Sequence, residues 1–75
     1  MKPMAVNSTT LTTVAYDVDR ELLQIEFCDG TVYQYSEVSA EVHEALMRAS
    51  SKGNYFNRAI RGRFAYVPCP AISLS

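Results

Sequence analysis

The chain has 75 residues, of which 48% are apolar and 20% are charged, and its formal net charge at pH 7 is −1. This composition is that of an ordinary globular domain and excludes an intrinsically disordered chain. A domain of this length buries only a small core, which leaves little room for a deep catalytic cleft. We therefore expect a binding or accessory module and not an enzyme.

Membrane spans and metal sites are also excluded. No run approaches the roughly 18 apolar residues that a membrane-spanning helix needs, and the N-terminal segment lacks the apolar stretch of a signal peptide. We therefore expect a cytoplasmic protein that does not contact a membrane. Cys28, Cys69 and His43 are too few for a zinc site and lack the spacing of a metal motif. We expect free thiols, no metal and no cofactor.

The first half of the chain has the residue pattern of β-strands. Residues 11–17 are rich in β-branched and aromatic side chains, which suit a strand. Residues 22–27 alternate between apolar and polar side chains, which predicts a strand with one solvated face. Asp29 and Gly30 predict a tight hairpin before a third strand at residues 31–35.

The hairpin between the second and third strands allows two registers, and a slip of one residue reverses the face of every side chain. A two-residue loop would leave Tyr33 and Tyr35 exposed as an aromatic platform. A three-residue loop with a bulge at Gly30 would pair Phe27 with Thr31 and turn both tyrosines toward the core. We favour the bulged register because it places more apolar area on one face.

After the third strand the period of the apolar residues changes to that of a helix. Ser39 is a good N-cap for a first helix. Gly53 can end that helix in the left-handed conformation, and Asn54 can cap a short second helix at residues 55–61. The expected fold class is α+β: a three-stranded antiparallel β-meander followed by two helices packed on one face.

The domain organisation follows from the two ends of the chain. Residues 1–9 contain Pro3 and a polar run, and they are expected to form a flexible leader. Residues 68–75 contain two prolines and are expected to form a C-terminal tail. Residues 10–67 are therefore expected to form a single domain.

Charges are distributed unevenly along the chain. Eight acids and two cations precede residue 48, whereas five cations and no acid follow from Arg48 onward. Arg48 is expected to pair with Glu44, one helical turn earlier. The other cations lie close to two asparagines around the second helix, and we call this set the cationic patch. Its members are Lys52, Asn54, Asn57, Arg58, Arg61 and Arg63.

The cationic patch has the composition of an anion-binding surface. Arginine binds phosphate through paired hydrogen bonds, and asparagine bonds the edges of bases. Tyr33 and Tyr35, if exposed, are candidates for stacking on unpaired bases. RNA is the leading ligand hypothesis, and an acidic protein surface is the alternative. A third interpretation is that the patch only solvates a helix face, and the net charge of −1 argues against strong nonspecific binding of nucleic acid.

The order of these residues resembles the KTSC domain family over about residues 8–66. The resemblance rests on Tyr16, on Leu23-x-Ile25-x-Phe27-x-x-Gly30, on Tyr33-x-Tyr35-x-x-Val38 and on Ser51-x-Gly53-x-Tyr55-Phe56-Asn57-x-x-Ile60-Arg61. The family takes its name from a segment at the C-terminus of some lysyl-tRNA synthetases, and it also occurs as small free-standing bacterial proteins. The resemblance thus implies a bacterial domain with these boundaries, for which RNA is a reasonable ligand. Ser39 replaces a proline usual in the family and can still start a helix.

Overall fold

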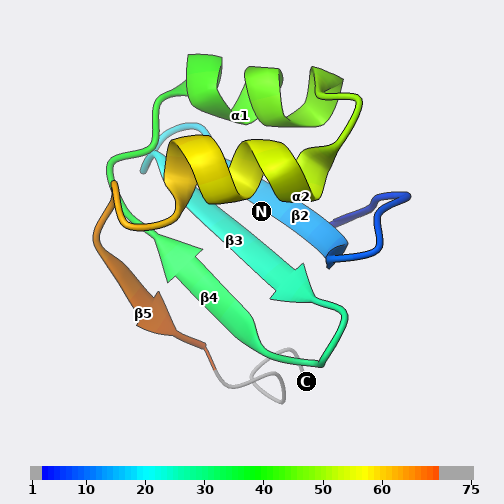
Figure 1. Cartoon of the computed structure of the whole chain (residues 1–75). Helices are drawn as coiled ribbons and strands as arrows, with labels where there is room; N and C mark the ends of the chain where they lie inside the picture. The colour runs from blue at the N-terminus through cyan, green and yellow to red at the C-terminus, as the bar shows by residue number, and fades with distance from the viewer. Residues whose placement is uncertain (1–2, 70–75) are drawn as a thin grey trace.

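The computed structural model describes residues 3–69 as one sheet covered on one face by two helices (Figure 1). The strands are antiparallel and follow one another in chain order across the sheet. They are β1 (Met4–Ala5), β2 (Leu11–Asp17), β3 (Leu22–Phe27), β4 (Val32–Tyr35) and β5 (Tyr66–Pro68). The helices are α1 (Ala40–Arg48) and α2 (Lys52–Tyr55), and α2 continues directly into a π-helical turn, η1 (Phe56–Ile60). The predicted α+β class is confirmed.

The prediction of three strands was wrong, because the sheet formed by residues 3–69 has five. β1 pairs with β2 and lies within the range expected to be a leader, and β5 pairs with β4. Each added strand is two or three residues long and exposed, so neither shows the alternation that identifies a strand in a sequence. Pro68 belongs to β5, and residues 70–75 of the predicted tail lie outside the described residues.

The hairpin between β3 and β4 has the bulged register, as predicted. The backbone N–H of Phe27 donates to the carbonyl of Thr31 at 2.8 Å, and Gly30 adopts a φ of +94°. Tyr33 and Tyr35 therefore lie on the face of the sheet that packs against the helices. Only a residue without a Cβ adopts such a φ without strain, which is why this turn contains glycine.

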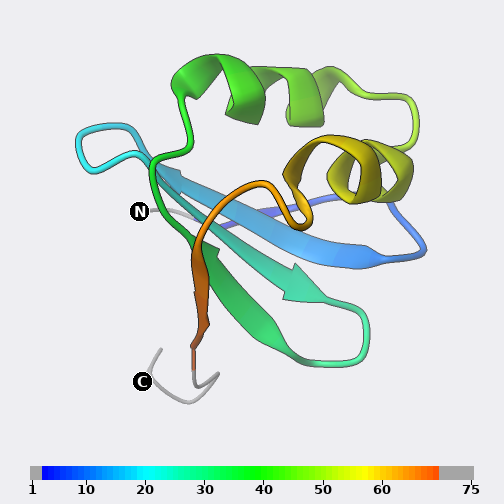
Figure 2. The ribbon, with the colours of Figure 1, turned by 60° about the vertical axis from the view of Figure 1, so that its left-hand side comes forward.

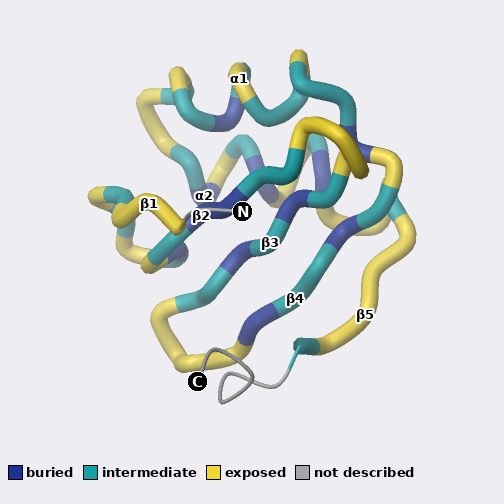
Figure 3. The backbone as a smooth tube through the Cα atoms, turned by 180° about the vertical axis from the view of Figure 1, so that it is seen from behind, coloured by how far each residue is buried: buried dark blue, intermediate teal, exposed yellow. Residues whose placement is uncertain are grey.

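The core lies between the sheet and the helices, on one side of the sheet (Figure 2). Along β3, buried positions alternate with less buried ones, as a half-covered sheet requires (Figure 3). The buried core residues are Leu11, Val14, Leu23, Ile25, Tyr35, Val38, Leu46, Phe56 and Ile60. Burial of a Leu, Ile, Val or Phe side chain of this kind stabilises a fold by about 1.5–3 kcal/mol relative to its exposure.

The ends of the helices differ from the prediction. Ser39 caps α1, as expected, by accepting a backbone N–H of the first turn at 3.4 Å. The extended backbone of Ala49 ends α1 before Gly53 is reached, so the prediction that Gly53 ends this helix was wrong. Gly53 lies inside α2, and Ser51 rather than Asn54 caps that helix. None of the helices in residues 3–69 has the length and apolarity that a membrane crossing requires.

His43 of α1 stacks on Tyr16 of β2, with ring centroids 4.5 Å apart and planes 9° from parallel. Burial lowers the pKa of His43 below its ordinary value, although the nearby Glu44 carboxylate opposes this effect. The unfolded chain then binds a proton more readily than the folded chain. The free energy of unfolding is therefore expected to fall as pH decreases through about 6.5, the ordinary pKa of histidine.

Urea unfolding at about pH 7.5 and about pH 5.5 measures this pH dependence, since exposed carboxylates stay ionised across that window. The variant His43→Gln supplies the control, because it keeps a polar side chain at the same position but does not titrate. The drop in stability is expected to be smaller in the variant. An equal drop in both proteins would show that His43 is not its source.

Candidate binding site

Two members of the cationic patch are engaged by the backbone around them. Lys52 Nζ donates to the carbonyl of Ala49 at 3.2 Å, just after the end of α1. Arg63 Nε donates to the carbonyl of Arg58 at 3.1 Å, which ties the loop after η1 back to the helix. Both contacts satisfy carbonyl groups near helix ends, so these two cations also stabilise the local backbone.

Asn54 and Arg58 line a groove between α1 and α2. The guanidinium carbon of Arg58 lies 5.8 Å from the ring centroid of Tyr55, within the range of a cation–π contact. The same groove is also lined by Arg48, Asn57, Glu41 and Glu44. The two carboxylates offset the charges of the two arginines, which reduces the attraction of this groove for phosphate groups.

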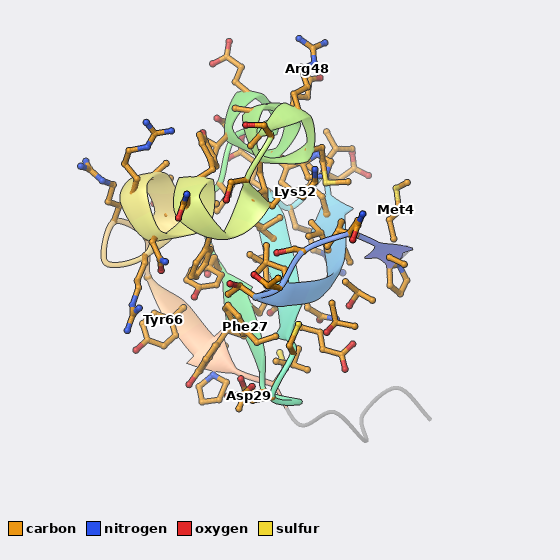
Figure 4. All side chains as sticks on the ribbon, turned by 45° about the vertical axis from the view of Figure 1, so that its right-hand side comes forward. Met4, Phe27, Asp29, Arg48, Lys52 and Tyr66 are labelled. Atoms are coloured by element: carbon orange, nitrogen blue, oxygen red, sulfur yellow. The ribbon has the colours of Figure 1, made fainter. Side chains whose placement is uncertain are left out.

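The predicted ion pair between Glu44 and Arg48 was wrong. Within residues 3–69 the single ion pair joins Arg20 and Asp17, at 4.0 Å. Figure 4 shows Arg48 pointing away from the domain at the end of α1. Exposed ion pairs contribute little free energy, so an i,i+4 spacing on a solvated helix face does not fix the two side chains together.

A second hollow, which we call the aromatic pocket, is lined by residues of β3, β4, β5 and η1 and of the loops next to them. Its volume is about 710 Å³. Its aromatic lining residues are Phe27, Tyr33, Tyr35, Phe56 and Tyr66. The further lining residues are Asn57, Arg61 and Gly62 around η1, and Thr9, Thr10, Cys28, Asp29 and Thr31 near the β3–β4 hairpin.

The sheet register brings these rings together. Tyr33 and Tyr35 are two residues apart on β4 and share a face, and Tyr66 of β5 lies opposite Tyr35. The Tyr66 ring centroid is 5.2 Å from that of Tyr33 and 5.5 Å from that of Tyr35. Phe27 reaches the same cluster, 5.8 Å from Tyr33, because of the bulged register.

The three tyrosines differ in exposure. Tyr66 is 53% exposed, Tyr33 is half-buried and Tyr35 is only 4% exposed. Tyr35 is thus a core residue whose ring faces are covered. Its predicted role in stacking required an exposed ring, so Tyr35 is not a stacking residue. Burial raises the pKa of Tyr35 to about 12, with smaller contributions from Tyr66 and Tyr33, while the Arg61 guanidinium opposes the shift.

Asn57 and Arg61 meet at the rim of the aromatic pocket. Both line it, and Arg61 Nη1 donates to Asn57 Oδ1 at 3.4 Å. The π-helical turn between them is closed by the Arg61 N–H, which donates to the carbonyl of Phe56 at 2.9 Å. Such widened turns are frequent at functional sites. The structure therefore divides the cationic patch: Arg61 belongs to the aromatic pocket, whereas Arg58 belongs to the groove beside α1.

Tyr66 is the binding-site candidate that the sequence did not identify. Its strand is three residues long, with every residue exposed, so the segment carries no periodic signal. Cys28 and His43 lie on different parts of the fold, since Cys28 lines the aromatic pocket and His43 stacks on Tyr16. Both cysteines are free, and no three His, Cys, Asp or Glu side chains in the described range are grouped as a metal site requires.

Comparisons with known proteins place this arrangement in a family. Residues 7–64 match the family model of the KTSC domain. An uncharacterized protein of Stutzerimonas stutzeri is 38% identical over 61 residues, which cover 81% of this chain and 86% of that protein. The lysine–tRNA ligase of Nostoc punctiforme is 42% identical over 52 residues, which cover 69% of this chain.

The match to the ligase spans only 9% of its length. The fold agrees with that of a crystal structure of a KTSC domain protein from Yersinia pestis, with a TM-score of 0.90 and 32% identity. That likeness covers 92% of this chain and 97% of the other. The resemblance noted in the sequence is confirmed: this chain belongs to the KTSC domain family.

Proposed function

We propose that this KTSC domain is a small non-catalytic module that binds single-stranded RNA at the aromatic pocket. One observation carries the proposal: the partly exposed rings of Tyr33 and Tyr66 lie in the same pocket as the Arg61 guanidinium. Stacking of an unpaired base on an aromatic ring contributes about 1–3 kcal/mol. An arginine beside the ring binds the phosphate of the same or the next nucleotide.

The charges of the protein favour short-range contacts with the RNA over long-range electrostatic attraction. Arg58, Arg61 and Arg63 are exposed and close in sequence. The chain as a whole nevertheless has a net charge of −1, so its acidic residues oppose the approach of a polyanion. The affinity is therefore expected to come from stacking and from a few phosphate contacts, as in an accessory RNA contact.

The relatives support RNA as the ligand class. Lysine–tRNA ligases of two Nostoc strains contain a segment that is 41–42% identical to this chain. By their name, those enzymes act on a tRNA. A domain attached to such an enzyme has RNA close to it during the reaction, which makes RNA the first ligand to test here.

The alternative is a protein partner that pairs with an outer strand of the sheet. Within the described residues the two outer strands are β1, which is only two residues long, and β5, whose residues Tyr66, Val67 and Pro68 are all exposed. Pro68 has no N–H to donate to an added strand, which weakens this interpretation. The aromatic pocket is the better-supported site because several binding groups converge in it.

Fluorescence anisotropy of a labelled oligouridine hexamer tests the proposal. If three arginines contact phosphates, the logarithm of the binding constant should fall with the logarithm of salt concentration with a slope of about −2. Arg48→Ala is the control, since that exposed cation lies at the end of α1 and does not line the aromatic pocket. The proposal fails if no binding is seen at low salt.

A further inference from the structure

The rim of the aromatic pocket around η1 offers hydrogen-bond donors. A guanidinium has no acceptor atom, so the side-chain bond between Arg61 and Asn57 fixes Oδ1 of Asn57 as the acceptor. The Nδ2 group of Asn57 is then free to donate, with no partner within residues 3–69. The remaining guanidinium N–H groups of Arg61 are donors as well. This end of the pocket therefore matches a ligand edge that carries acceptors.

The end near the hairpin offers a negative acceptor. Asp29 Oδ1 accepts from the backbone N–H of Thr31 at 3.0 Å and from its hydroxyl at 2.7 Å. These hydrogen bonds lower the pKa of Asp29, so its carboxylate is ionised at neutral pH. The second carboxylate oxygen has no hydrogen-bond partner in the described range. Figure 4 shows Asp29, Phe27 and Tyr66 on the same side of the domain, below α2.

A base that fills this pocket needs acceptors on one edge and donors on another, with an aromatic face between them. Guanine has this pattern, because O6 and N7 are acceptors and the N1–H and N2 amino groups are donors. Adenine has the opposite polarity at two of these positions, since N6 is a donor and N1 is an acceptor. Cytosine and uracil are smaller and do not combine an acceptor edge with two adjacent donors.

We infer that the aromatic pocket is a guanine site, in which Arg61 and Asn57 donate to the O6/N7 edge and Asp29 accepts from N1 and N2. This inference rests on the proposed function, because it names the base that the RNA-binding pocket prefers. The ring of any base that enters the pocket stacks on Tyr66 and Tyr33. The polar groups at the two ends select the base.

The test compares oligouridine hexamers that carry one guanosine or one adenosine at the same internal position, by fluorescence anisotropy. The guanosine hexamer is expected to bind at least roughly fivefold more tightly. Replacing guanine by 7-deazaguanine removes the N7 acceptor, and replacing it by hypoxanthine removes the N2 amino donor. Each replacement is expected to reduce the advantage in affinity that the guanosine hexamer has over the adenosine hexamer.

Asp29→Asn identifies the residue that reads the donor edge. Asparagine keeps one side-chain oxygen to accept from Thr31 in the turn, so the hairpin is preserved, but it removes the negative charge. In this variant the N2 amino group is expected to contribute much less, so that guanine and hypoxanthine hexamers bind with similar affinity. A variant that still separates the two bases as strongly as the wild type would overturn the role of Asp29.

The outcomes separate this inference from the proposed function. Equal binding of the guanosine and adenosine hexamers overturns the guanine site and leaves RNA binding in place. Absence of binding by every hexamer overturns RNA binding. The affinities of free GMP and AMP are then compared to test whether the pocket prefers guanine. Preference for GMP over AMP supports the guanine site with a free nucleotide as its ligand, and equal or absent binding of both overturns it.

Discussion

Replacing Tyr66 by alanine is expected to weaken the binding of a single-stranded RNA hexamer about five- to a hundredfold, as the loss of one stacked base predicts. The reason is that Tyr66 is the most exposed ring of the aromatic pocket, at 53%. The fold is expected to survive this change, because Tyr66 lies on an outer strand and is not part of the buried core. Anisotropy titration of wild type and variant measures the change.

Two further variants of β5 and its pocket sharpen this prediction. Val67→Ala is the matched control, because Val67 is 55% exposed on the same strand but points to the other face of the sheet. Tyr66→Phe keeps the ring and is expected to retain most of the affinity. An equal loss in Val67→Ala and Tyr66→Ala would contradict binding at the aromatic pocket.

Replacing Gly53 by alanine is expected to destabilise the fold by about 1–2 kcal/mol. Gly53 is buried in α2, and a Cβ there would lie 2.8 Å from Thr10 Oγ1 and 3.1 Å from Thr10 Cβ. Overpacking of this kind costs about 1–3 kcal/mol, which exceeds the gain of up to about 1 kcal/mol that alanine gives within a helix. Urea unfolding measures the difference in the free energy of unfolding.

A double-mutant cycle shows whether the contact with Thr10 is the cause. In the background Thr10→Ala the nearest atom is removed, so the cost of Gly53→Ala is expected to shrink. Asn54→Ala is the control for helix propensity, since Asn54 is exposed in the same helix and is expected to change stability by less than about 0.5 kcal/mol. A neutral or stabilising Gly53→Ala would contradict this account of the glycine.

The central strands and their register were predictable from the sequence, and the helix ends were not. Alternation over residues 22–27 and the turn at Gly30 are local features that determine their own geometry. The role of Gly53 depends instead on Thr10, more than forty residues earlier in the chain. A glycine required by a close tertiary contact looks the same in a sequence as a glycine that ends a helix.

The candidate site was predictable in composition but not in arrangement. The sequence identified Asn57 and Arg61, and it grouped them with Arg58 in one patch around an ordinary second helix. The π-helical turn η1 changes that period, so Arg58 and Arg61 line different hollows. Tyr66 became a candidate only through the pairing of β5 with β4, a contact between distant segments.

An NMR titration of the ¹⁵N-labelled domain with the guanosine-containing hexamer tests the central claim most directly. Binding at the aromatic pocket predicts that the largest amide shift changes fall on residues that line it and not the other groove, including Tyr33, Arg61, Gly62 and Tyr66. Amides of α1 along the other groove, such as Glu41, are expected to change little. Shift changes centred on that groove, or no changes at low salt, would contradict the account.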